Sequence, residues 1–134
     1  MVKSSDILVI QSSKEELKRA EDFLHGFFDE HEIPLDMFNR VYLCLSEAVL
    51  NSIQHGNRKD HDKHVYIKTR CADGSLFLEV QDEGKGFDYS HLENPTKRNN
   101  IKKESGRGIH IIKSLSDGIE FLKNGTCIRF KIFY

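Results

Sequence analysis

The chain has 134 residues, of which 38% are hydrophobic and 31% charged, and a formal net charge of −1 at pH 7. This length and composition predict one globular domain, residues 1–134, with a core of its own. The small net charge argues against a direct nucleic-acid binder. No apolar run approaches the roughly 20 residues that span a bilayer, and the three cysteines stand far apart, so we expect a cytoplasmic protein without a membrane segment or disulfide framework.

The chain is predicted to open with a short strand and a helix. Residues 7–10, Ile-Leu-Val-Ile, form an apolar run of strand length. Ser12-Ser13 offers an N-cap, and apolar residues then recur at helical spacing, which predicts a helix over about 13–31. The aromatic stripe of this helix fits core or a partner surface better than a cofactor site.

The second helix is predicted to be central. Ile33-Pro34 breaks the first helix, and Leu35-Asp36 opens another that runs to Gly56. Its sides are apolar nearly all round, which is typical of a buried helix. Residues 57–63 follow as a charged, solvated loop. Its histidines suggest a metal site, but no paired cysteines or regular carboxylate cage accompany them, so solvation explains this loop better.

This second helix carries a polar stripe. Glu47, Asn51 and His55 stand at four-residue steps, so they project from one side. A carboxylate that can take a proton, beside an amide oxygen that can ligate Mg²⁺, suits a nucleotide site. Alone, however, the stripe fits better an amphipathic helix whose polar side meets solvent.

A hairpin ends in the first of two glycine-bearing turns. Alternating residues predict strands over 65–70 and 76–81, joined at Asp73-Gly74. The return strand leads into Asp82-Glu83-Gly84-Lys85-Gly86-Phe87. The spaced glycines allow close approach of the backbone to a ligand, and the aspartate can accept a hydrogen bond from an exocyclic amine. An ordinary turn after a strand is the alternative.

The second glycine-bearing turn follows a long polar segment. Residues 88–105 are predicted to form a lid or binding loop, or to be disordered. Gly106 and Gly108 then lead into an apolar helix of about 107–116, whose first N–H groups could bind an anion. The alternative is a hinge before an ordinary core helix.

The C-terminal residues complete the predicted architecture. Strands over 118–122 and 126–133 form a second hairpin around Lys123-Asn124-Gly125. The order is then β-α-α-β-β-lid-α-β-β. It predicts an α+β fold, a two-layer α/β sandwich in which helices pack on one face of a mixed, largely antiparallel sheet.

Three motifs in a fixed order give the chain a family resemblance. Glu47-x-x-x-Asn51, Asp82-x-Gly84-x-Gly86 and Gly106-x-Gly108 resemble the N, G1 and G2 boxes of the GHKL ATPase superfamily, whose fold is the Bergerat ATP-binding fold. The resemblance covers nearly the whole chain. Within the superfamily, the segments 46–56, 82–87 and 105–109 look closest to small bacterial anti-sigma factors that are also serine-protein kinases.

The resemblance implies an ATP and Mg²⁺ site with assigned roles. Glu47 would be the catalytic general base, and Asn51 would ligate Mg²⁺ that bridges the ATP phosphates. Asp82 would bind the adenine amino group. Gly84 and Gly86 would shape the adenine pocket, and Thr126 would lie near the adenine. Gly106 and Gly108 would let the lid close over the phosphates.

The sequence does not identify the basic residue that would contact the phosphates. Glu104 stands where a basic residue would suit a phosphate better. Lys102, Lys103 or Arg107 could supply that charge, but solvation of the lid explains them equally well. Two histidines, His55 and His110, are interpreted as packing residues, with a supporting role open for His55.

The implied function is that of an anti-sigma factor with serine-protein kinase activity. It would phosphorylate an anti-anti-sigma antagonist protein, sequester an RNA polymerase sigma factor, and form a homodimer. One alternative is a non-catalytic, nucleotide-dependent protein-interaction switch of the same fold. A detached histidine-kinase catalytic domain is less favoured, because no dimerisation helices with a phosphoacceptor histidine precede the Glu47 motif.

Overall fold

The computed structural model describes residues 4–84 and 104–134, and its elements follow the predicted order. Their bounds are β1 (Ser4–Gln11), α1 (Leu17–His31), α2 (Phe38–Asn51), β2 (His64–Ala72), β3 (Ser75–Gln81), α4 (Glu104–Leu115), β4 (Gly118–Leu122) and β5 (Cys127–Phe133). The predicted lid falls outside the described residues except at its end, where residues 104 and 105 belong to α4. Gly86 also lies outside them.

The strands form one sheet in the order β1-β2-β3-β5-β4. Every described pairing between neighbours is antiparallel, where we predicted a mixed, largely antiparallel sheet. The hairpin predicted at Asp73-Gly74 is confirmed. Both residues have positive φ, 53° and 77°, as a two-residue turn requires if it is to match the twist of the strands.

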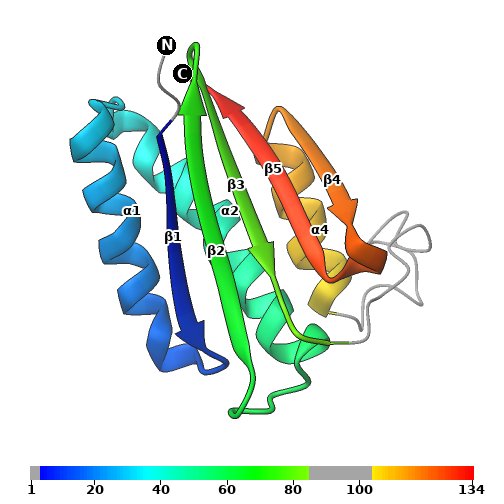
Figure 1. The fold of residues 1–134 in the computed structure, drawn as a ribbon. Coiled ribbons are helices and arrows are strands. Elements are labelled where there is room, and N and C mark those ends of the chain that lie inside the picture. The colour runs from blue at the N-terminus through cyan, green and yellow to red at the C-terminus, as the bar shows by residue number, and fades with distance from the viewer. Residues whose placement is uncertain (1–3, 85–103) are drawn as a thin grey trace.

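Three helices cover one face of this sheet, with α2 between α1 and α4 (Figure 1). The strands turn one set of residues toward the helices, such as Val65 and Ile67, while Tyr66 and Lys68 lie on the other face. The largest fully buried side chains include Phe27, Phe28, Leu24, Leu45, Leu78 and Phe130. The predicted two-layer sandwich is therefore confirmed. None of the described helices is long and apolar enough to cross a membrane.

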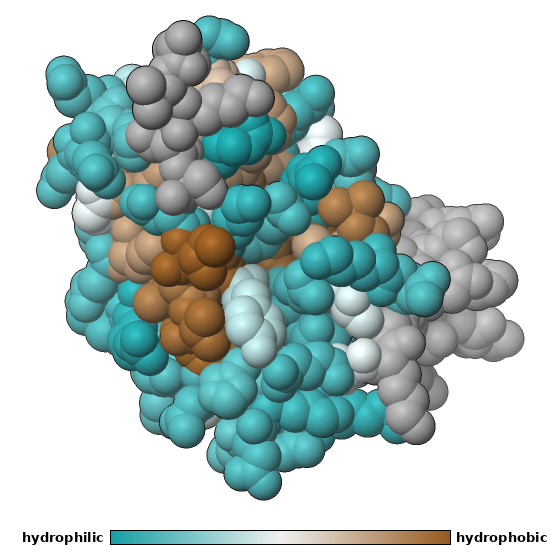
Figure 2. Space-filling model, viewed as in Figure 1, coloured by the Kyte–Doolittle hydropathy of each residue, from teal (hydrophilic) through white to brown (hydrophobic). Residues whose placement is uncertain are grey.

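The opposite face of the sheet carries no described helix. Apolar side chains gather on this face over β1 (Figure 2), where Ile7 is 65% exposed and Val9 is 42% exposed. Charged residues of both signs, Lys68, Glu79 and Arg129, follow across the neighbouring strands in one row of the register. We call this surface the open face.

The two ends of the described chain meet at one end of the sheet. Ser4 pairs with Cys71 near the end of β2, and the N–H of Tyr134 donates to the carbonyl of Gly74 at 2.8 Å. Strand β2 starts at His64, just after α2 and its loop, and runs to this hairpin. The hairpin and the chain ends therefore lie at the end of the sheet away from the C-terminus of α2 (Figure 1).

Candidate functional site

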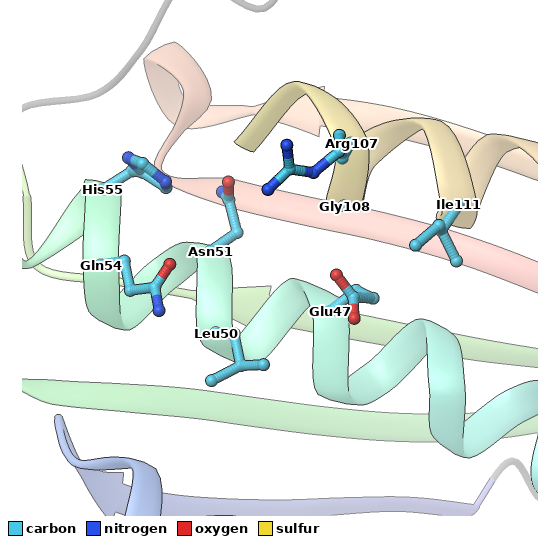
Figure 3. A pocket seen from close by; sticks show the side chains of 8 residues that line it. All are labelled: Glu47, Leu50, Asn51, Gln54, His55, Arg107, Gly108 and Ile111. Atoms are coloured by element: carbon cyan, nitrogen blue, oxygen red, sulfur yellow. The ribbon is translucent and has the colours of Figure 1, made fainter. Parts of the chain in front are cut away.

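A cavity of about 320 Å³ lies between α2 and α4. It is lined by Glu47, Leu50, Asn51, Gln54, His55, Arg107, Gly108 and Ile111. The whole predicted stripe therefore faces this cavity and does not sit on an ordinary solvated helix surface (Figure 3). Asn51 is only 4% exposed. The packing of α4 against α2 converts a polar stripe into one wall of a site.

The last turn of this helical segment departs from the prediction. Ser52–Gly56 forms a π-helical turn, η3, that follows α2, where we expected a regular helix as far as Gly56. The N–H of Asn57 closes this turn by donating to the carbonyl of Ser52 at 2.7 Å. Wide turns of this kind are rare and recur at functional sites. Here the turn buries Ser52 and Ile53 while His55 lines the cavity.

Glu47 of α2 lies directly against Gly108 of α4. Gly108 is buried, and a Cβ atom added to it would stand 2.9 Å from Glu47 Oε1. Glu47 is half-buried, and burial raises the pKa of its carboxyl group. A carboxylate with a raised pKa is a stronger base than an ordinary surface glutamate.

Helix α4 begins earlier than predicted, at Glu104 instead of about residue 107. Gly106 and Gly108 therefore lie inside the first turns of the helix and do not lead into it. Arg107 lines the cavity, and Figure 3 shows its side chain directed from α4 toward Asn51. Of the three basic residues considered from the sequence, Arg107 is the one among the described residues, and it belongs to the cavity wall.

A second cluster forms around Asp82, which is 5% exposed at the end of β3. Its N–H donates to the carbonyl of Thr126 at 2.9 Å, and the N–H of Gly84 donates to its Oδ1 at 2.7 Å. Burial raises the pKa of the Asp82 carboxyl, against the opposing effect of the Gly84 hydrogen bond. Asp82, Gly84 and Thr126 are thus brought together.

Gly56 completes this cluster, a role that the sequence patterns do not predict for it. A Cβ atom on Gly56 would overlap the Asp82 carboxylate, and a Cβ atom on Gly84 would overlap the carbonyl oxygen of Gly56. The end of η3 therefore packs directly on the turn after β3. Since His55 lines the cavity, η3 joins the cavity to the Asp82 cluster.

Two predictions about residues close in sequence to the site residues are wrong. The charged composition predicts that Asn57 belongs to the solvated loop over 57–63, but Asn57 is 1% exposed, while the following Arg58 and Lys59 are exposed. The prediction of a packing histidine at residue 110 also fails, because His110 is exposed. Both errors have the same cause, because local composition does not show which residues of a polar segment meet the rest of the fold.

The sequence comparison assigns the family. The family model described as histidine kinase-like ATPase domain matches residues 10–132. The chain belongs to the histidine kinase-like ATPase family. This membership agrees with the GHKL resemblance and with the helix-covered antiparallel sheet.

Relatives within the histidine kinase-like ATPase family carry informative names. An anti-sigma F factor of Heyndrickxia coagulans is 36% identical over 112 residues, covering 79% of this chain and 76% of that protein. The anti-sigma F factor of Bacillus subtilis is 28% identical over 110 residues, covering 78% and 75%. The serine-protein kinase RsbW of Staphylococcus epidermidis is 28% identical over 107 residues, covering 75% and 67%.

Proposed function

We propose that this protein is an anti-sigma factor with serine-protein kinase activity. It transfers the γ-phosphate of ATP to a serine of a small anti-anti-sigma protein, and it sequesters an RNA polymerase sigma factor while that antagonist is phosphorylated. The observation that carries the proposal is the cavity in which α2 and α4 place Glu47, Asn51 and Arg107 together. The names of the relatives support it. A cytoplasmic location follows from these partners.

Adenine is proposed to bind at the Asp82 cluster. A buried carboxylate accepts a hydrogen bond strongly, because the local dielectric constant is low. The Asp82 carboxylate fits this task, since its Oδ1 is already oriented by the N–H of Gly84. The glycines at 56 and 84 keep side chains away from the carboxylate. Thr126 contributes its backbone carbonyl to the same turn.

The phosphates are proposed to bind in the cavity. Asn51 offers an amide oxygen, the hard donor that Mg²⁺ prefers, and it is buried in the cavity wall, so its chemistry fits the metal. Mg²⁺, when bound, would supply the charge neutralisation on which phosphoryl transfer depends. Arg107 is proposed as a further cation for the phosphates. Gly86 and Gly106 keep the pocket and lid roles that the resemblance implies.

Glu47 is proposed as the general base. It would accept the proton of the attacking serine hydroxyl, and its raised pKa makes it a better acceptor than a solvated glutamate. Gly108 leaves the room that the carboxylate occupies. Catalysis would otherwise rest on positioning and on charge neutralisation by the cavity wall.

The proposed assembly is a homodimer that uses the open face. An exposed apolar area beside a row of alternating charges can pair with a second copy of itself. Light scattering on the wild type and on Ile7→Glu tests this part, and a monomeric wild type would rule it out.

Phosphotransfer is the decisive experiment for the kinase function. The protein would be incubated with Mg²⁺, γ-labelled ATP and each small anti-anti-sigma protein encoded in the source genome. Glu47→Gln and Asn51→Ala test the two assigned roles. Asn39→Ala and Glu30→Gln are matched controls, because both residues are exposed on the same helical layer.

We expect acid-stable label on a serine with the wild type and both controls, and loss of label with both site variants. ATP binding without transfer to any antagonist would replace the kinase by a nucleotide-dependent interaction switch. No ATP binding at all would reject both functions.

A further inference from the structure

Asn57 stands at the junction of four segments of the fold. Its Oδ1 accepts the N–H of Glu83 at 2.8 Å, after β3. Its Nδ2 donates to the carbonyl of His64 at 3.0 Å, where β2 begins, and to Ser12 Oγ at 3.2 Å, after β1. Its N–H closes the η3 turn on Ser52. Both ends of the amide are therefore used, and a buried amide with satisfied donors and acceptors specifies one arrangement.

The bond to Glu83 bears directly on the proposed adenine site, because Glu83 lies between Asp82 and Gly84. The N–H of Asp82 is held by Thr126, and the N–H of Gly84 is held by Asp82 itself. The N–H between these two, that of Glu83, donates to Oδ1 of Asn57, which directly follows η3. Asn57 therefore links the turn that presents the Asp82 carboxylate to the helical segment that carries the cavity residues.

The backbone that follows Asn57 has an unusual conformation. Arg58 and Lys59 both have positive φ, 53° and 61°. Such left-handed conformations of non-glycine residues cost on the order of 1 kcal/mol each and persist only where surrounding contacts impose them. The chain leaves η3 through this strained bend while Asn57 stays buried. Asn57 supplies part of these contacts, together with the N–H of Lys59, which donates to the carbonyl of Ile53 at 2.7 Å.

Glu83 adds a second connection on the same turn. Its carboxylate accepts the N–H of His64 at 2.7 Å and the hydroxyl of Tyr66 at 2.9 Å. This pair lies at the exposed surface, so solvent weakens it. The buried amide of Asn57 is the stronger determinant of where the turn sits.

We propose that Asn57 is a positioning residue for the nucleotide: through the amide of Glu83 it fixes the Asp82 carboxylate relative to α2 and so sets affinity for the adenine end. This inference rests on the proposed adenine role of Asp82. A residue that served stability alone would lower the folded fraction without changing the affinity of the molecules that remain folded.

Nucleotide binding by calorimetry separates the two roles, with the folded fraction measured by circular dichroism. ATP, ADP and inorganic tripolyphosphate serve as probes. Asn57→Ala removes all three side-chain bonds. Asn57→Asp keeps an oxygen for the N–H of Glu83 but loses the donor to His64. Ser12→Ala is the matched control, because it removes a bond of the same buried network on the side away from Asp82.

We expect Asn57→Ala to weaken the binding of ATP and of ADP by the same factor, about tenfold, because both nucleotides contain adenine. Tripolyphosphate affinity should stay unchanged. Asn57→Asp should keep ATP affinity closer to the wild type, because it retains the acceptor for the N–H of Glu83. If the alanine variant does not fold, a loss of ATP affinity in Asn57→Asp would overturn the inference. Ser12→Ala should lower stability and leave ATP affinity unchanged.

Wild-type ATP affinity in folded Asn57→Ala would overturn the inference. So would an equal loss of affinity in Ser12→Ala. Phosphotransfer is not part of these measurements, so ATP binding without kinase activity would reject the proposed kinase and leave the role of Asn57 standing. A wild type that binds no ATP would reject both.

Discussion

The carboxylate of Glu47 lies so close to Gly108 that a side chain at residue 108 would displace it. A Cβ atom at residue 108 would lie 2.9 Å from Glu47 Oε1 and 3.8 Å from its Cβ. The closer atom is the free end of a flexible side chain, so the carboxylate would move before the helices did. The packing of α4 on α2 therefore depends little on Gly108, whereas the position of the proposed base depends on it strongly.

Gly108→Ala should consequently lower activity more than stability. We expect kcat for phosphotransfer to fall about tenfold, the effect of losing roughly 1.4 kcal/mol of transition-state stabilisation. Gly26→Ala on α1 is the matched control, because nothing lies within 4 Å of the added Cβ. It should stabilise the protein by about 0.5–1 kcal/mol and keep kcat. An unchanged kcat in Gly108→Ala would contradict this relationship.

Gly84→Ala should mainly lower stability, whereas Gly56→Ala should mainly lower ATP affinity. The added Cβ overlaps backbone atoms of Gly56 in the first variant and the side chain of Asp82 in the second. We expect Gly84→Ala to cost about 1–3 kcal/mol of unfolding free energy, since the backbone must shift. Gly56→Ala should mainly weaken ATP binding by displacing the carboxylate. Chemical denaturation and calorimetry on both variants check this order, which equal stabilities would refute.

Asp82→Asn should stabilise the protein without nucleotide and weaken ATP binding. Burial raises the folded-state pKa of Asp82 above its ordinary value of 3.8. At pH values between the unfolded-state pKa and the folded-state pKa, the folded state therefore binds more protons than the unfolded state. Stability from this group is then present at low pH and lost as pH rises through the folded-state pKa. Asparagine removes that loss and keeps an oxygen for the N–H of Gly84.

Thermal unfolding between pH 4 and pH 8 should show a higher Tm for Asp82→Asn at the upper end of the range and a flatter pH profile. ATP affinity should fall about tenfold or more, because a charge-assisted hydrogen bond is lost. A lower Tm at pH 8 would mean that the ionised carboxylate stabilises the fold.

The pH dependence of phosphotransfer should report Glu47. Its raised pKa places the acid limb of kcat above the ordinary value of 4.5, because the base must be deprotonated to act. Glu47→Gln should remove the limb and lower kcat by about 10²–10⁴-fold. Rate–pH profiles of the two proteins check this, and an acid limb that persists in the glutamine variant would assign it to another group.

Arg40 should contribute to stability and leave nucleotide binding alone. Its Nε donates to the carbonyl of Leu115 at the end of α4, and its guanidinium lies 3.3 Å from Asp117 Oδ2. That carboxylate oxygen also accepts the N–H of Phe133. Because the pair is partly exposed, we expect Arg40→Ala to cost only about 1–2 kcal/mol. A double-mutant cycle with Asp117→Ala, combined with ATP titration, tests this; weaker ATP binding would contradict it.

The sequence was informative where a local pattern determines the structure. The Asp73-Gly74 hairpin needs two residues that tolerate positive φ, and the central place of α2 follows from its apolar sides. The polar stripe from Glu47 to His55 also faces one cavity, as its spacing allowed. In these cases the local preference and the tertiary contacts agree.

The sequence was uninformative where contacts between residues distant in the sequence determine burial or backbone conformation. Nothing in its composition distinguishes Asn57 from the charged residues that follow it, because its burial depends on partners after β1 and β3. The apolar spacing that predicts a regular helix as far as Gly56 does not indicate the π-helical turn at Ser52–Gly56. The glycines at 106 and 108 suggested a boundary before a helix, but α4 absorbs both. Gly56 gains its importance only from the carboxylate packed against it.

The arrangement of the chain ends has a practical consequence for handling the molecule. Ser4 and Tyr134 lie beside the β2–β3 hairpin, and β2 alone separates them from the cavity end by nine residues, about 30 Å of extended strand. A sensor surface attached at Tyr134 would therefore hold the molecule with its cavity turned toward solution. Binding of nucleotides and of large protein ligands could then be followed on tethered molecules without the attachment obstructing either.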